Sequence, residues 1–294
     1  MEGTVSDVAI DTGFEALRAR LEDPCYEIIP LKGIEKKAER IPEGLDVAIT
    51  CSPDKGMPAT LELTRRLCGR GFNLIPHIAA RMVADEAQLR DILSELDDLG
   101  IRRIFVVGGD AEQPVGQFDS SLQLLRLMAT IDHGIEVVGV GAYPEGHPLI
   151  DDSTLLGFLR EKQPFAAYMV NQMCFDPEVI VQWLLRIRAE GVELPVHIGV
   201  PGVAERAKLL RIALKIGVGQ SARFLKSNLG LVGRMLSPGG YSPDELLLAL
   251  APCFDRSPYM VEGVHFFSFN QIESTEKWRA EMLHRLRGGK DPDR

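Results

Sequence analysis

Short apolar runs rich in β-branched and aromatic residues alternate along this chain with longer segments that show the 3.6-residue period of helices. The runs are apolar throughout, as is typical of strands in a parallel sheet that is covered on both faces. We predict strands at residues 25–31, 45–51, 72–78, 103–107, 136–142, 166–173, 195–200 and 263–269.

The segments between the strands predict helices. The clearest case begins near Asp85, because Leu89, Ile92 and Leu96 fall on one face and Gly100 follows as a C-cap residue. A helical insertion at about 221–254, broken by the string SPGGY, precedes the last strand. The other predicted helices lie at about 13–22, 58–69, 120–131, 152–161, 177–189, 204–216 and 274–287.

Eight consecutive strand–helix units predict an α/β fold with a parallel sheet. A doubly wound open sheet gives a similar string of elements, but the count of eight favours a closed (β/α)8 TIM barrel. No linker rich in proline, glycine or serine divides the 294 residues. We therefore expect one domain over residues 1–294, with the barrel at about 24–288.

Composition narrows the functional classes. The net charge of −9 argues against nucleic-acid binding, which needs clustered lysine and arginine. The five cysteines are odd in number and show no CxxC spacing, which favours a reducing compartment over disulfides or zinc. The sequence shows no signal peptide and no apolar run of roughly 20 residues, so we expect a cytoplasmic protein without a membrane span.

Polar residues recur where the apolar strands end. Because the carboxyl ends of parallel barrel strands meet at one face, these residues are expected to surround one pocket. Glu27 lies within the first strand, and the string AYPEGHP at residues 142–148 supplies a rigid loop with Tyr143 and His147. The strand-end residues are Thr50, His77, Asp110, Gln172 and Asn270.

Each of these residues has a functional and a structural interpretation. Burial of Glu27 is expected to raise its pKa toward values useful for acid catalysis, but a structural ion pair explains a strand glutamate equally well. The string GGD, with Gly108 and Gly109 before Asp110, suits close approach to a ligand or a tight turn. The histidines, including His197 and His265 inside strands, show no metal-ligand spacing, and we interpret those two as structural.

Together these motifs resemble the methylenetetrahydrofolate reductase family over residues 26–273. The loop AYPEGHP matches the family's AYPExHP without departure. The strings EIIP, PHIA, GGD, NQMCFD and HFFSFN resemble the family's EFFP, PHLT, RGD, TQFFFD and HFYTLN motifs; they begin at Glu27, Pro76, Gly108, Asn171 and His265.

This resemblance implies reduction of 5,10-methylenetetrahydrofolate to 5-methyltetrahydrofolate, with hydride passing from NAD(P)H through FAD. It implies that Glu27 is the acid that opens the methylene bridge, that Asp110 lies between flavin and pterin, and that Gln172 contacts the pterin. It further implies that flavin is contacted by Thr50, His77, Gly108, Gly109, Asp110, Tyr143 and His147.

The chain departs from the family where flavin phosphates are held. Gly108 replaces an arginine, and the family's aspartate and lysine fall on Thr154 and Glu161, with Lys162 adjacent. Direct hydride transfer from NAD(P)H without flavin is therefore an open alternative. A folate-dependent methyltransferase and a non-catalytic pterin-binding relative are two others. We expect a homo-oligomer and no metal.

Overall fold

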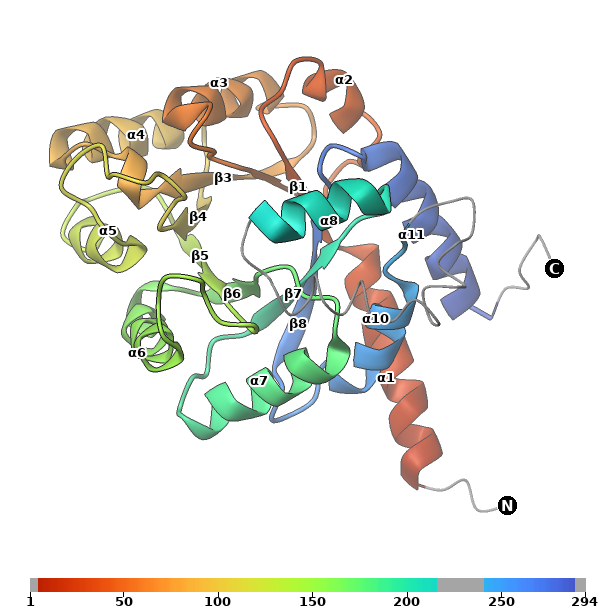
Figure 1. Ribbon diagram of the computed structural model, residues 1–294. Helices are drawn as coiled ribbons and strands as arrows, with labels where there is room; N and C mark the ends of the chain where they lie inside the picture. Colours follow the sequence, from red (N-terminus) through yellow and green to blue (C-terminus); the bar gives the residue numbers. More distant parts are fainter. Residues whose placement is uncertain (1–4, 216–240, 289–294) are drawn as a thin grey trace.

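The computed structural model describes residues 5–215 and 241–288, and it confirms the predicted fold class. Eight parallel strands close into a barrel in sequence order, with β8 pairing β1 (Figure 1). The strands are β1 Cys25–Ile28, β2 Asp46–Ile49, β3 Asn73–Ala79, β4 Arg103–Val107, β5 Val137–Ala142, β6 Tyr168–Asn171, β7 Val196–Pro201 and β8 Val261–Phe267.

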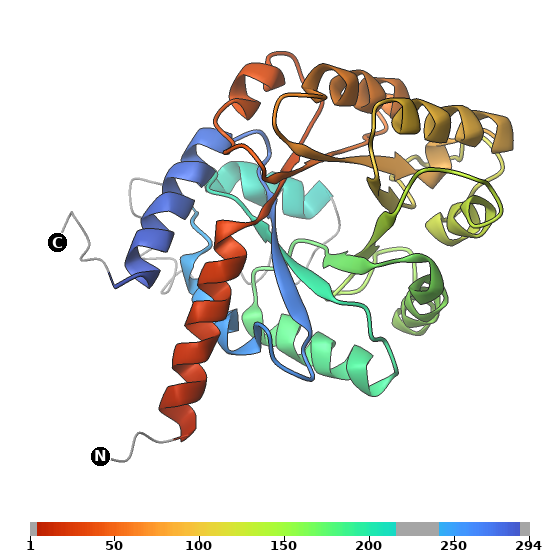
Figure 2. The ribbon, with the colours of Figure 1, turned by 180° about the vertical axis from the view of Figure 1, so that it is seen from behind.

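Helices surround the barrel, and the views from both sides show α1 running beside α11 (Figures 1 and 2). Three short 3-10 helices, η1 Ala80–Met82, η2 Gln163–Phe165 and η4 Ala251–Cys253, complete the described elements. The α-helices are α1 Val5–Glu22, α2 Ile34–Ala38, α3 Gly56–Leu67, α4 Glu86–Asp98, α5 Ser121–Met128, α6 Asp152–Lys162, α7 Pro177–Ala189, α8 Arg206–Lys215, α10 Asp244–Leu250 and α11 Ile272–Leu286.

Among the differences from the sequence-based prediction, three concern the first 40 residues. The first strand ends at Ile28 rather than residue 31, since Pro30 has no N–H group to donate to a neighbouring strand. Helix α1 begins at Val5, earlier than the predicted start near residue 13. The five-residue helix α2 was not predicted, because one short turn carries no clear period. Residues 221–240 of the predicted insertion lie outside the described residues, and α10 with η4 forms the remainder.

The barrel interior is filled by side chains rather than open. Phe105 and Tyr168 belong to an apolar cluster inside the strands, and small residues opposite them make room. A Cβ atom at Gly139 would lie 2.5 Å from the rings of both Phe105 and Tyr168. This packing fills the lower barrel, and a cavity opens toward the carboxyl ends of the strands.

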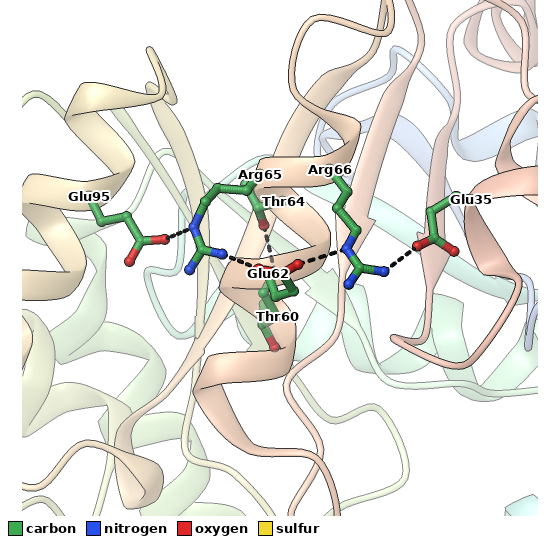
Figure 3. A network of polar contacts seen from close by, with 7 residues as sticks. All are labelled: Glu35, Thr60, Glu62, Thr64, Arg65, Arg66 and Glu95. Carbon is green, nitrogen blue, oxygen red and sulfur yellow. Dashed lines mark hydrogen bonds and ion pairs between the residues drawn. The ribbon is translucent and has the colours of Figure 1, made fainter.

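An ion-pair network links α2, α3 and α4 on the outer surface (Figure 3). Arg66 donates to Glu35 at 2.9 Å and to Glu62 at 2.7 Å, while Arg65 donates to Glu62 and, at 2.9 Å, to Glu95. These groups are exposed, so each pair contributes little to stability. The main stabilisation comes from the apolar layer between strands and helices.

Candidate active site at the barrel mouth

Two adjoining cavities open at the carboxyl ends of the strands. The barrel cavity, of about 300 Å³, reaches down to Glu27, and the side cavity, of about 610 Å³, lies beside it against α5, α6 and α7. All nine residues to which the family resemblance assigns a catalytic, substrate or cofactor contact line one or both cavities, whereas Asn270, also expected at the pocket, lines neither. The fold therefore brings residues from separate strand ends together at one face, as predicted. Six residues line both cavities: Gly109, Asp110, Gly141, Ala142, Tyr143 and Gln172.

Glu27 lies inside the barrel, with two imidazole rings beside its carboxylate. His265 Nε2 lies 3.3 Å from Glu27 Oε2, and His77 Nε2 lies 3.9 Å from the same oxygen. The Glu27 side chain is 17% exposed, so water reaches it only through the cavity. The alternative of a lysine or arginine partner at the barrel bottom is not what the structure shows, because the partners of Glu27 are histidines.

The pKa of Glu27 differs from the expectation that burial would raise it. Burial is the largest single influence and raises the pKa of Glu27, but the hydrogen bond from His265 and the electrostatic contributions of His77 and His265 together outweigh it, and the net pKa is lowered. Burial alone lowers the pKa of His265, but its contacts with Cys25 and Glu27 raise that pKa to about 10. At neutral pH the pair therefore holds one proton, which resides on the imidazole.

Substituting Glu27 with glutamine is expected to lower the pKa of His265, because the imidazolium loses its carboxylate partner while remaining buried. Titration of the ring by NMR measures this shift. The folded pKa of about 10 lies above the ordinary histidine value of 6.5. Protonated His265 therefore contributes stability that is full below pH 6.5 and is lost as the pH rises through about 10. An unchanged His265 titration in Glu27→Gln would contradict the pairing.

Two buried polar atoms in the barrel cavity have no hydrogen-bond partner in the described structure. They are Thr50 Oγ1 and His77 Nε2. Burial lowers the pKa of His77 to about 4, so its ring is neutral at physiological pH. Buried polar groups are normally paired, and an orphan that faces a cavity is typical of a site completed by a ligand.

The string GGD forms the turn after β4. Gly109 has a φ of +92°, and a Cβ atom there would lie 3.0 Å from Ala79 Cβ, so the turn requires glycine. Gly108 differs, since nothing lies within 4 Å of the position a Cβ would take. Asp110 follows with its side chain exposed between the two cavities.

The AYPEGHP loop places two rings together near Asp110. Tyr143 and His147 meet edge to face, with 5.2 Å between ring centroids. Burial and the nearby Asp110 carboxylate raise the pKa of Tyr143. Tyr143 lines both cavities, whereas His147 lines only the side cavity. The loop therefore forms part of the wall of each.

Gln172 and Asn270 make different contacts. The Gln172 side-chain oxygen accepts from the backbone N–H of Met173 at 2.9 Å, which leaves its Nε2 amide as the group available to a ligand. The Asn270 side chain accepts from the N–H of Ile29 at 2.8 Å and donates to its carbonyl at 3.0 Å. Asn270 therefore fixes the end of β8 to the end of β1 and does not line either cavity.

His265 was interpreted as structural from the sequence, but the structure places it at the candidate site. It lines the barrel cavity and contacts Glu27. Barrel closure supplied the missing signal: β8 pairs β1 with His265 opposite Cys25, two residues before Glu27 on the same face. His197 fits its structural interpretation, because it stacks on Tyr168 at 4.5 Å and lines neither cavity.

Within residues 5–215 and 241–288, no group of three histidine, cysteine or acidic side chains is arranged to hold a metal ion. In the same part of the chain, no helix combines the length and apolar character needed to cross a bilayer.

Comparison with known proteins identifies relatives of one family. The family model for methylenetetrahydrofolate reductase matches residues 32–224, more than half of the chain. The match excludes Glu27 and His265, so their assignment rests on the geometry above.

Curated relatives agree at modest identity. Methylenetetrahydrofolate reductase 1 of Schizosaccharomyces pombe is 24% identical over 199 residues, covering 65% of this chain and 32% of that protein. The 5,10-methylenetetrahydrofolate reductase of Pectobacterium carotovorum is 27% identical over 151 residues, half of each protein. The chain thus spans half or less of the length of these relatives.

Among solved structures, an uncharacterized protein from Clostridium thermocellum shares the fold with a TM-score of 0.63 and 12% identity. The similarity covers 92% of this chain and 99% of that one, and that protein binds two copies of 5-methyl-5,6,7,8-tetrahydrofolic acid. The fold, the motif order around the mouth and the family match agree, and this chain belongs to the methylenetetrahydrofolate reductase family.

Proposed function

We propose that this chain reduces 5,10-methylenetetrahydrofolate to 5-methyltetrahydrofolate with hydride from NAD(P)H. The observation that carries the proposal is the Glu27–His265 pair at the base of a cavity whose rim bears Asp110 and Gln172. The family membership and the folate bound by the Clostridium thermocellum protein support a pterin as the occupant.

The chemistry requires one proton and one hydride. Breaking the bond between the methylene carbon and N10 needs a proton on that nitrogen, and the resulting iminium carbon accepts the hydride. A shift of the proton from His265 Nε2 to Glu27 Oε2 yields a carboxylic acid that can donate it. Asp110 would balance positive charge on the iminium, and the Gln172 amide would orient the pterin ring.

Flavin is the carrier that the family resemblance implies, and it transfers hydride between NAD(P)H and substrate when bound. The ring end of such a cofactor fits the orphaned Thr50 Oγ1 and His77 Nε2 in the barrel cavity, beside the buried Tyr143. We therefore assign the ring-contacting positions to Thr50, His77 and Tyr143.

The side cavity fits the diphosphate end of a flavin cofactor less well. Arg81 lines the side cavity, but its guanidinium donates to the carbonyls of Ala111 and Glu112 at 2.8 Å each. Lys162 also lines the side cavity, and in the described structure no carboxylate lies within 4 Å of its ammonium group. Burial lowers the pKa of Lys162 to about 8. Glu112 and other acidic side chains face the same cavity. We infer that FAD binds weakly.

Direct hydride transfer from NAD(P)H to the folate is the second candidate. The observation that favours it is Gly108, which supplies no cation where the family's arginine would hold the flavin diphosphate. In this alternative Glu27, His265 and Gln172 keep their assignments, and the nicotinamide ring occupies the space assigned to flavin.

The test is NAD(P)H oxidation by the purified protein with 5,10-methylenetetrahydrofolate, measured with and without added FAD. Turnover that requires FAD supports the flavin route, and equal turnover without flavin supports direct transfer. Folate binding with no NAD(P)H oxidation under either condition would contradict the reductase and favour a non-catalytic relative or a methyltransferase.

Gly108→Arg is expected to increase FAD affinity by about tenfold to a hundredfold, because one charge-assisted hydrogen bond contributes roughly 1.5–3 kcal/mol. The open space around Gly108 leaves room for the side chain. Fluorescence titration with FAD measures the effect, and Gly108→Gln is the neutral control. Equal affinities in both variants would show that the side cavity does not hold the diphosphate.

A further inference from the structure

His265 has two ring nitrogens, and its pairing with Glu27 uses only one of them. Nε2 lies 3.3 Å from the Glu27 carboxylate, which leaves Nδ1 for another partner. A protonated imidazole carries an N–H group on each nitrogen, and His265 is only 3% exposed. Because a buried donor without an acceptor is costly, the charged ring requires a second acceptor inside the barrel.

Barrel closure places the thiol of Cys25 beside this ring. β8 pairs β1 with His265 directly opposite Cys25, and Glu27 lies two residues further along β1 on the same face. The thiol forms a hydrogen bond with His265 and belongs to a residue that is only 5% exposed. The ring therefore has the carboxylate as its partner toward the cavity and the sulfur as its partner away from it.

Aromatic side chains restrict the plane of the His265 ring. Phe105 of β4 stacks on it with 6.4 Å between ring centroids, and Phe267 meets it edge to face at 5.2 Å. Cys25 packs in the same apolar cluster as Phe105. A flip of the ring would place carbon atoms where the two nitrogens now lie, so both polar partners are kept only in the observed orientation.

The other titratable groups around the ring carry no net charge at neutral pH. Burial lowers the pKa of His77 on β3 to about 4 and that of His197 on β7 to about 3, so both rings are neutral. In the lower barrel, burial raises the pKa of Tyr168 on β6. Arg103 of β4 and Asp46 of β2 form an ion pair there at 2.7 Å and neutralise each other. The proton on the ring is therefore governed mainly by the carboxylate and the thiol.

We propose that Cys25 is a positioning residue whose sulfur accepts a hydrogen bond from His265 Nδ1 and thereby keeps Nε2 directed at Glu27. In the proposed reaction the proton passes from Nε2 to the Glu27 carboxylate and then to the substrate nitrogen, while the Nδ1 proton stays on the ring. The ring that remains is the neutral Nδ1–H tautomer, and its Nε2 lone pair can receive the next proton from water in the cavity. The fate of the proton rests on the proposed function, whereas the contact between Cys25 and His265 does not.

The experiment is NMR titration of the His265 ring in the whole chain with isotope-labelled histidine, the signal being assigned by its absence from His265→Gln. In Cys25→Ala the sulfur acceptor is lost, and the pKa of His265 is expected to fall from about 10 by about one pH unit, the scale of one hydrogen bond to a charged group. The alkaline limb of the kcat/KM profile should move to lower pH by the same amount, because only the protonated pair can deliver a proton. KM for the folate should stay unchanged, since Cys25 lines neither cavity.

Matched variants separate the hydrogen bond from packing. Cys25→Ser keeps an acceptor at the same position and should restore the wild-type titration and pH profile. Cys25→Val fills the volume without an acceptor and should behave as Cys25→Ala. Cys253→Ala removes another buried thiol that lines neither cavity, and it should leave the His265 titration unchanged.

Two outcomes would overturn the inference and leave the proposed reduction standing. An unchanged His265 titration in folded Cys25→Ala or Cys25→Val would show that the thiol is not a partner of the ring. Equal shifts in Cys25→Ser and Cys25→Ala would show that packing, rather than a hydrogen bond, is responsible. Conversely, a protein that shows the expected shifts but does not oxidise NAD(P)H with the folate would refute the reductase and leave the contact between Cys25 and His265 standing.

Discussion

Glu27→Gln is expected to lower kcat for 5,10-methylenetetrahydrofolate reduction by about 10²- to 10⁴-fold, the usual contribution of a positioned acid. The glutamine side chain has nearly the same shape and keeps an oxygen near His265, so the fold should be preserved. What is lost is the group that accepts a proton from the imidazole and passes it to the substrate. Steady-state NAD(P)H oxidation measures the effect.

A surface substitution of the same type provides the control. Glu62 belongs to the exposed ion-pair network between α2, α3 and α4, far from the cavities, and Glu62→Gln should leave turnover unchanged (Figure 3). Titration with 5-methyltetrahydrofolate should show that Glu27→Gln still binds folate, because the proton matters for bond breaking rather than for pterin binding. Turnover of Glu27→Gln within a factor of about three of wild type would end the acid assignment.

The sequence was sufficient to predict the architecture, because each barrel strand is a short apolar run between segments with a clear helical period. All eight strands could be placed from such patterns, and so could the helices α3, α4, α5, α6, α7, α8 and α11. Helix α2 could not, because its five residues bury only Ile34 and Ala38. The convergence of Glu27, Asp110 and Gln172 followed from parallel topology alone.

The electrostatics of the site could not be predicted in the same way. Burial of Glu27 suggested a raised pKa, but the sign depends on which side chain lies nearest, and that neighbour is His265, 238 residues away. Only the pairing of β8 with β1 brings them together.

Loss of Arg279 is expected to produce the largest destabilisation of the fold, about 3–5 kcal/mol, because it leaves a largely buried carboxylate without its partner. Arg279 of α11 donates to both carboxylate oxygens of Glu276, at 2.8 and 2.7 Å, and to the Leu21 carbonyl at 2.8 Å. Tyr26 of β1 donates to the same carboxylate at 2.5 Å. The cluster therefore joins the first strand to both terminal helices.

Chemical denaturation of Arg279→Met measures this loss as a lower midpoint at an unchanged slope. The double variant Glu276→Met with Arg279→Met removes both charges and should recover much of the stability, since a buried pair often contributes little more than apolar residues of the same size. Arg65→Met is the surface comparison and should shift the midpoint little, because its partners Glu62 and Glu95 remain hydrated. An Arg279→Met midpoint equal to that of Arg65→Met would show that the cluster is dispensable, and that apolar packing alone holds β1 against α11.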